Sequence, residues 1–118
     1  AALGLAYKPD IDDLRESPAI ETAALLVKEG AQVRTWEPFK PDHAVPGAQA
    51  AASLAEAVQD ADLILLLVNH SELRALNPAA LAAQTPARLA LDTVGAWQPS
   101  AWEAAGFRLL RLGVGEPH

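Results

Sequence analysis

The chain contains no cysteine, and this absence removes several kinds of chemistry at once. Disulfide bonds, thiolate zinc sites and a cysteine nucleophile are all excluded within its 118 residues. The three histidines, His43, His70 and His118, lie far apart in the sequence and show none of the spacings typical of metal ligands. We therefore expect no metal site.

Basic residues and long apolar runs are also scarce. Nine lysines and arginines stand against fifteen aspartates and glutamates, so the formal net charge is -6. Because nucleic acids and anionic membranes bind proteins through basic surfaces, we expect neither as a partner. No run approaches the roughly 18 apolar residues of a membrane span, and no basic and apolar leader is visible. These absences predict a cytoplasmic protein.

The glycine pattern of a dinucleotide-binding turn is missing as well. That pattern, G-x-G-x-x-G between a first strand and a first helix, lets the backbone approach a pyrophosphate closely. Here only Gly4 is present, and bulky residues follow it at 5–8. Glu37 ends the second predicted strand, where a Rossmann acid would hold a ribose. Without the glycines, we expect Glu37 to have a structural role.

What the sequence does contain is an alternation of strand and helix patterns. A hydrophobic content of 51% with 20% charged residues indicates a globular chain, and the length suits a single domain covering 1–118. The predicted strands are 1–6, 32–36, 63–68, 88–91 and 107–112, and the predicted helices are 18–29, 53–59, 71–76, 78–84 and 99–105. Such alternation implies parallel strands with helices on both faces. We predict an α/β fold, a three-layer Rossmann-like sandwich with a mostly parallel five-stranded sheet.

The first strand has no methionine before Ala1, so we expect the sequence to be a fragment of a longer protein. A long charged loop follows this strand. It contains two cations, Lys8 and Arg15, among four acids, which are Asp10, Asp12, Asp13 and Glu16. Loops between strands and helices usually have about 2–6 residues. This loop is longer and lies beyond the carboxyl end of a strand, where open α/β sheets bind ligands. The pattern leaves open whether Arg15 contacts a ligand or pairs with the neighbouring acids.

Residues 4–9 (Gly-Leu-Ala-Tyr-Lys-Pro) and 13–18 (Asp-Leu-Arg-Glu-Ser-Pro) closely resemble the C-terminal, UDP-binding domain of the UDP-glucose/GDP-mannose dehydrogenase family. Further similar segments follow in the same order at 36–39 (Trp-Glu-Pro-Phe), 61–73 and 91–97 (Leu-Asp-Thr-Val-Gly-Ala-Trp). The resemblance therefore covers essentially the whole chain. The charged loop is most similar to the UDP-N-acetyl-D-mannosamine and UDP-N-acetylglucosamine dehydrogenase branch.

The resemblance implies the function of a longer parent enzyme. Members of this family use NAD to oxidise the C6 alcohol of a nucleotide sugar to a carboxylate, which implies a role in polysaccharide precursor synthesis. They bind NAD in an N-terminal domain, carry the catalytic cysteine in a central dimerising region, and close this C-terminal domain over the UDP-sugar. The resemblance thus implies partner domains in the same parent chain and a homodimeric parent, and no cofactor or catalysis in the fragment alone. The alternative is a stand-alone, non-catalytic Rossmann-like nucleotide-binding or regulatory module.

The resemblance also implies which residues bind the substrate, and it implies no catalytic residue within this chain. Lys8 matches the family lysine that reaches toward the sugar hydroxyls and the reacting centre, and Tyr7 matches an aromatic residue beside it. Arg15 matches the arginine of the Asp-x-Arg-Glu-Ser motif, as a ligand contact or as a residue that pins the loop. Asp92 and Thr93, at the end of the fourth predicted strand, are further candidates for the same cleft.

One position departs from the family pattern. Many members carry an arginine or lysine near the position of Val94 or Gly95, and that cation contacts the nucleotide or sugar. Here backbone amides or another cation must replace it, or nucleotide binding is weaker. We expect His70 to be a loop histidine without a functional role, and Trp97 and Trp102 to pack in the core.

Overall fold

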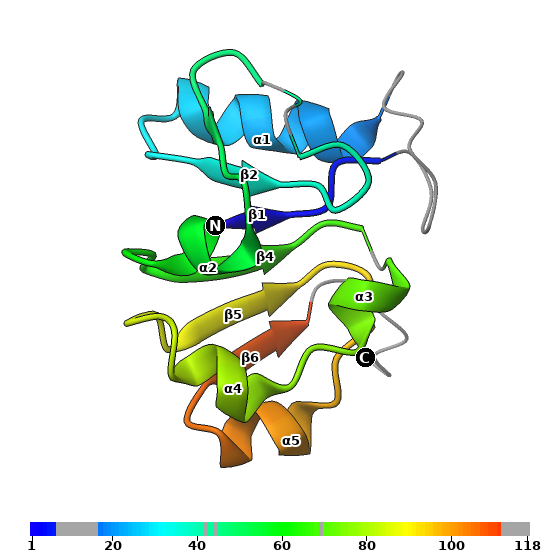
Figure 1. The fold of residues 1–118 in the computed structure, drawn as a ribbon, viewed down its shortest axis with the longest axis vertical. Coiled ribbons are helices and arrows are strands. Elements are labelled where there is room, and N and C mark those ends of the chain that lie inside the picture. The colour runs from blue at the N-terminus through cyan, green and yellow to red at the C-terminus, as the bar shows by residue number, and fades with distance from the viewer. Residues whose placement is uncertain (7–16, 42, 44, 69, 112–118) are drawn as a thin grey trace.

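The computed structural model describes residues 1–6, 17–41, 43, 45–68 and 70–111. At its centre is a six-stranded parallel sheet with the strand order β3-β2-β1-β4-β5-β6 (Figure 1). The strands are β1 (Ala2–Leu3), β2 (Arg34–Trp36), β3 (Gln49–Ala50), β4 (Leu63–Leu66), β5 (Leu89–Asp92) and β6 (Arg108–Arg111). The chain runs outward from β1 to β2 and β3, then returns to the other side of β1 to form β4. The point between β1 and β4 is therefore a topological switch point. Open α/β sheets bind ligands beyond the carboxyl ends of the strands at such a point.

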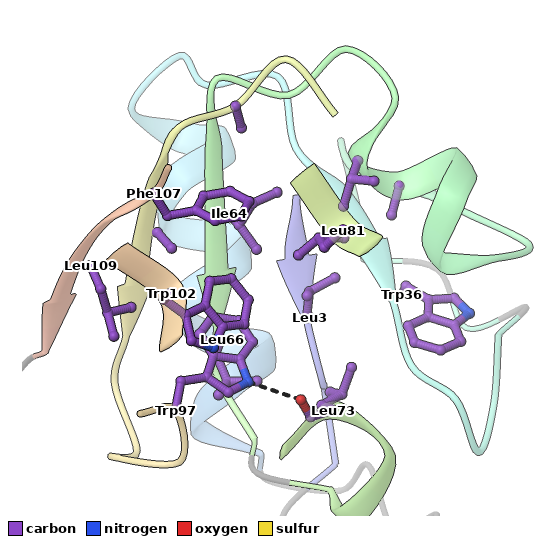
Figure 2. Packing of buried hydrophobic residues seen from close by; sticks show 14 of the residues in the cluster. Leu3, Trp36, Ile64, Leu66, Leu73, Leu81, Trp97, Trp102, Phe107 and Leu109 are labelled. Atoms are coloured by element: carbon purple, nitrogen blue, oxygen red, sulfur yellow. Dashed lines mark hydrogen bonds between the residues drawn. The ribbon is translucent and has the colours of Figure 1, made fainter. Parts of the chain in front are cut away.

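Helices cover both faces of this sheet. They are α1 (Pro18–Lys28), α2 (Leu54–Val58), α3 (Ser71–Arg74), α4 (Pro78–Ala82) and α5 (Pro99–Ala104). Buried side chains of α2 to α5 join the large core cluster on one face, whereas α1 lies behind the sheet in Figure 2. The three-layer α/β architecture predicted from the sequence is thus confirmed. No helix within the described ranges is long and apolar enough to cross a membrane.

The helix boundaries follow the sequence signals. Ser17 caps α1, because its Oγ accepts a hydrogen bond from the Ala19 amide at 3.2 Å, and proline occupies the first helical position. Gly30 follows the end of α1 with a φ of 98°, a left-handed conformation that glycine adopts without strain. The side chain of Asn77 accepts hydrogen bonds from two amides in the first turn of α4. These local signals were all visible in the sequence.

Aromatic packing stabilises the larger core cluster (Figure 2). The rings of Trp97 and Trp102 stack with centroids 3.9 Å apart, and Phe107 packs against Trp102 at 5.0 Å. The indole N–H of Trp97 donates to the Leu73 carbonyl at 2.9 Å, so this buried polar group is satisfied. The prediction that both tryptophans are core residues is confirmed.

Two predictions about the strands were wrong in detail. The first predicted strand reached residue 6, but β1 ends at Leu3 because Gly4 has a φ of 91° and turns the chain. The sheet has six strands instead of five, since β3 was not predicted. This edge strand has two residues, and its flanking ladder bonds are Gln49 N to Val33 O at 2.9 Å and Ala51 N to Thr35 O at 2.7 Å. A two-residue strand is too short to produce an alternating pattern.

Candidate functional site

The carboxyl ends of β1, β2 and β4 meet at the switch point, and a single carboxylate connects all three. Glu37 follows β2, and its Oε1 accepts hydrogen bonds from the amides of Leu5 and Ala6 at 2.7 and 2.9 Å. The same oxygen lies 2.8 Å from Nε2 of His70, which follows β4. Oε2 accepts from the Phe39 amide at 2.9 Å. The side chains of Glu37 and His70 are both 0% exposed, so the pair fixes the backbone that leaves β1.

This geometry gives Glu37 a structural role. An acid that binds the ribose of a dinucleotide must offer its oxygens to the ligand. Both oxygens of Glu37 instead accept hydrogen bonds from its own chain, and the side chain is fully buried. The expectation that Glu37 is structural is therefore confirmed.

Sequence reasoning missed the partner of Glu37. His70 was expected to be a loop histidine, but it is a buried member of this pair, with the Phe39 ring centroid 4.9 Å from its own. A signal was available in the sequence. Glu37 and His70 each follow a predicted strand, and parallel strands bring their carboxyl ends to one edge of the sheet.

The charge state of Glu37 reflects its surroundings. Burial alone would raise the pKa of its carboxyl group, because burial disfavours the ionised form. The hydrogen bonds from His70, Leu5 and Phe39, with the charge of His70, outweigh burial and hold the pKa below its ordinary value of 4.5. The folded state therefore favours the ionised carboxylate.

Acid is accordingly expected to destabilise the chain through Glu37. A carboxyl group whose pKa is lower in the folded state stabilises the fold above its ordinary pKa of 4.5, and this contribution is lost as the pH falls through the folded value. The measurement is the free energy of unfolding in urea, from about pH 7 to about pH 3, for the wild-type chain and Glu37→Gln. Below about pH 4.5 the wild type should lose more stability than the variant. Parallel pH curves would contradict the assignment.

The charged loop begins and ends at this switch point. Ala6, the last described residue before it, is held by Glu37 through its amide. Ser17, the first described residue after it, donates its hydroxyl to the Leu5 carbonyl at 2.6 Å. The residues on either side of the segment 7–16 are therefore anchored at the switch point. The predicted site residues Tyr7, Lys8 and Arg15 lie outside the described residues, and their roles stay predictions.

Asp92 and Thr93 lie at the carboxyl end of β5, with partners inside the chain. Asp92 is 0% exposed, and its Oδ1 accepts from the amides of Val94 and Gly95 at 2.9 and 2.8 Å, while Oδ2 accepts from the Trp97 amide at 2.8 Å. The hydroxyl of Thr93 donates to the carbonyl of Leu66 in β4, at 2.7 Å. These bonds hold the turn after β5, and a ligand contact by either side chain stays a prediction.

Many family members carry a cation near the position of Val94 or Gly95, in this same turn. The amides of Val94 and Gly95 already donate to Asp92, so they are not free to replace it. A different cation stands beside the turn. Arg111, at the end of β6, donates from Nη2 to the Gly95 carbonyl at 3.2 Å, and its buried Nε has no partner within the described part of the chain. Within the described residues, Arg111 therefore brings a positive charge to this turn.

A protein-family model described as the UDP-glucose/GDP-mannose dehydrogenase family, UDP binding domain, matches residues 1–99. The chain belongs to the UDP-glucose/GDP-mannose dehydrogenase family. The match is to the UDP-binding domain, as the motif after β1 predicted. No three His, Cys, Asp or Glu side chains gather into a possible metal site in the described ranges.

The relatives that this chain matches are much longer than the matched region. It is 33% identical over 119 residues to UDP-N-acetyl-D-mannosamine dehydrogenase of Methanocaldococcus jannaschii, which covers 98% of this chain and 27% of that protein. It is 31% identical over 116 residues to UDP-glucose 6-dehydrogenase of Rhizobium meliloti, covering 96% of this chain and 26% of that protein. Both family relatives are thus matched over about a quarter of their length.

Solved structures of this family share the fold. The UDP-D-ManNAc dehydrogenase of Pyrococcus horikoshii superposes with a TM-score of 0.79 at 26% sequence identity. The superposition covers 98% of this chain and 25% of that one. The six-stranded sheet and its helices therefore correspond to one part of a larger family structure.

Proposed function

We propose that residues 1–118 are the substrate-binding, C-terminal domain of a longer, homodimeric NAD-dependent UDP-sugar dehydrogenase. The parent enzyme would oxidise the sugar C6 alcohol to a carboxylate for polysaccharide precursor synthesis. The observation that carries the proposal is the anchoring of the charged loop, whose two ends are fixed at the switch point by Glu37 and Ser17. This loop holds the family's most specific motif, and the switch point is where α/β sheets bind ligands.

In this proposal the charged loop binds the UDP-sugar. Lys8 faces the sugar and Tyr7 lies beside it, while Arg15 contacts the ligand or pins the loop. Lysine suits this role because its ammonium is a compact charge on a flexible stem. The named relatives include UDP-N-acetyl-D-mannosamine dehydrogenases, which favours an N-acetylated hexosamine as the sugar.

The oxidation itself is assigned to the preceding domains of the parent. The turn after β1 lacks G-x-G-x-x-G, and the strand-end acid Glu37 has both oxygens occupied. The chain also has no cysteine to act as a nucleophile. NAD and the catalytic cysteine would therefore come from outside these residues. This domain would bind and orient the substrate.

Replacing Lys8 by alanine in the full-length enzyme is expected to lower kcat/KM for the UDP-sugar by about 10- to 150-fold. That range corresponds to the loss of one charge-assisted hydrogen bond of about 1.5–3 kcal/mol. The measurement is steady-state kinetics with a panel of UDP-sugars. Lys28→Ala is the matched control, since Lys28 is an exposed lysine at the end of α1. Unchanged turnover in Lys8→Ala would remove Lys8 from the site.

The coding sequence upstream of Ala1 distinguishes this proposal from the alternative, a stand-alone binding module. A G-x-G-x-x-G domain followed by a region with a catalytic cysteine, in frame before Ala1, supports the dehydrogenase. A start codon directly before Ala1 supports the module. The match to only about a quarter of the relatives' length favours the dehydrogenase.

A further inference from the structure

One face of β4, β5 and β6 carries five leucines, and the exposed Arg108 of the edge strand β6 lies on the same face beside Leu89. In the register of the sheet, Leu63 lies beside Leu89, and Leu65 lies beside Leu91, which in turn lies beside Leu110. Alternate residues of a strand point to opposite faces, so these five side chains share one face. We call this set, Leu63, Leu65, Leu89, Leu91 and Leu110, the leucine face.

The described helices that could cover these three strands lie on the opposite face. Ile64, Leu66, Ala90 and Leu109 alternate with the leucines, and they are buried in the core cluster with side chains of α2, α3, α4 and α5. Toward β6 the leucine face becomes progressively more open. Leu65 is 5% exposed, Leu91 is half-buried and Leu110 is 41% exposed.

Helix α1 covers only the neighbouring part of this face. It joins β1 to β2, and its Leu26 lines a cavity with Ala2 of β1 and Leu65 of β4. A helix with its side chains is about 10–12 Å wide, and strands lie about 4.8 Å apart, so one helix covers about two strands. The span from β4 to β6 is about 10 Å, the width of one further helix. Parallel sheets are normally covered on both faces.

We propose that the leucine face is covered by an apolar helix from the polypeptide region that precedes this chain in the full-length protein. This inference rests on the proposed function, in which the chain is the C-terminal domain of a longer enzyme. It adds a specific interface between that domain and the rest of the same polypeptide.

The edge of the sheet at which the strands begin indicates which segment covers the leucine face. A cavity of about 850 Å³ lies at that edge, and its lining includes Ala1, Leu63 and Leu65. The cavity is therefore continuous with the leucine face through the last two residues. In the relatives this chain matches the C-terminal part, and about three quarters of the protein lies outside the matched region. A polypeptide that enters β1 at Ala1 must pass this edge, next to the leucine face.

Site-specific photo-crosslinking of the full-length protein tests the proposal. A photoreactive phenylalanine analogue at position 110 is expected to crosslink to a peptide that precedes Ala1 in the same polypeptide, without doubling the mass. The matched control is the analogue at position 25, because Leu25 on α1 is 57% exposed and lies outside the leucine face. A crosslink from position 110 to a second copy, or none at all, would overturn the proposal.

A charge substitution provides a second measurement. Leu110→Glu in the full-length protein is expected to lower the midpoint of thermal unfolding by several degrees, because it places a charge in an apolar interface. Leu25→Glu should leave the midpoint unchanged. Equal midpoints for the two variants would contradict the interface. If Leu110→Glu does not fold, the apolar crosslinking variant still decides the question.

These outcomes are separate from those that test the proposed function. A reading frame without any upstream domain would remove the longer enzyme itself. A full-length dehydrogenase in which position 110 crosslinks to nothing would leave the proposed function intact and remove only this interface.

Discussion

Replacing Glu37 by alanine is expected to lower the free energy of unfolding by about 3–5 kcal/mol, the usual cost of removing one partner of a buried charged pair. The substitution leaves the amides of Leu5, Ala6 and Phe39 without their acceptor, and His70 loses its buried partner. Each unsatisfied buried donor costs about 1–3 kcal/mol, reduced where water enters the space. Since small domains are stable by only about 5–15 kcal/mol, the variant should be marginally folded. Urea unfolding followed by circular dichroism measures the change.

Two further variants show how much of this loss comes from the hydrogen bonds that Glu37 accepts. Glu103→Ala removes an exposed glutamate from α5 and should change stability by no more than about 0.5 kcal/mol. Glu37→Gln keeps the shape and one carbonyl oxygen but turns an amide N–H₂ toward a donor, so its cost should be about 1–3 kcal/mol. A Glu37→Ala variant as stable as Glu103→Ala would show that the pair does not hold the strand ends together.

Replacing Gly4 by alanine is expected to lower the free energy of unfolding by about 2–5 kcal/mol. Gly4 has a φ of 91°, and a left-handed conformation costs a residue with a Cβ about 1–2 kcal/mol. An added Cβ would also lie 2.8 Å from Val68 Cβ and 3.0 Å from the backbone N and O of Val68. Because part of this contact is backbone, β1 and β4 must move apart, and overpacking of this kind costs about 1–3 kcal/mol. The measurement is again the free energy of unfolding in urea.

Gly30 supplies the matched control for Gly4. Its φ of 98° is similar, but a Cβ at this position would meet nothing within 4 Å. Gly30→Ala should therefore show the conformational cost alone, about 1–2 kcal/mol. The difference between the variants measures the close approach at the switch point. Equal losses of stability would mean that the strands adjust to a methyl group there without cost.

The architecture was predictable because its signals are local. Ser17 before a proline, Asn77 before a proline and the run 63–68 each identify an element without knowledge of the fold. The end of β1 and the strand β3 were not predictable in this way. Gly4 leaves the extended conformation at a point where Val68 lies close against it, and β3 is defined by its pairing with β2. Both features depend on contacts between segments distant in the sequence.

The candidate site was predictable in location but not in its internal connections. The motif after the first strand, with the rule that open α/β sheets bind ligands beyond the carboxyl ends of their strands, predicts a site at the edge where Glu37 and His70 meet. The pairing of Glu37 with His70 spans 33 residues, and no local pattern reports it. The approach of Arg111 to Gly95 likewise depends on β5 and β6 being neighbours. The roles of Lys8, Tyr7 and Arg15 in substrate binding stay predictions, which binding measurements on their variants would test.

Glu37 and Ser17 hold the backbone on either side of the segment 7–16. Glu37 accepts from the amides of Leu5 and Ala6, and Ser17 donates to the Leu5 carbonyl, so these three bonds join residues outside the segment 7–16. Closing a loop whose ends are already fixed depends only weakly on its length, with about 0.6 kcal/mol for each doubling. A change of length in that segment is therefore expected to leave these three bonds in place. In the proposed function, a change of sugar would therefore alter residues 7–16, while Glu37 and Ser17 keep the backbone on either side of them in place.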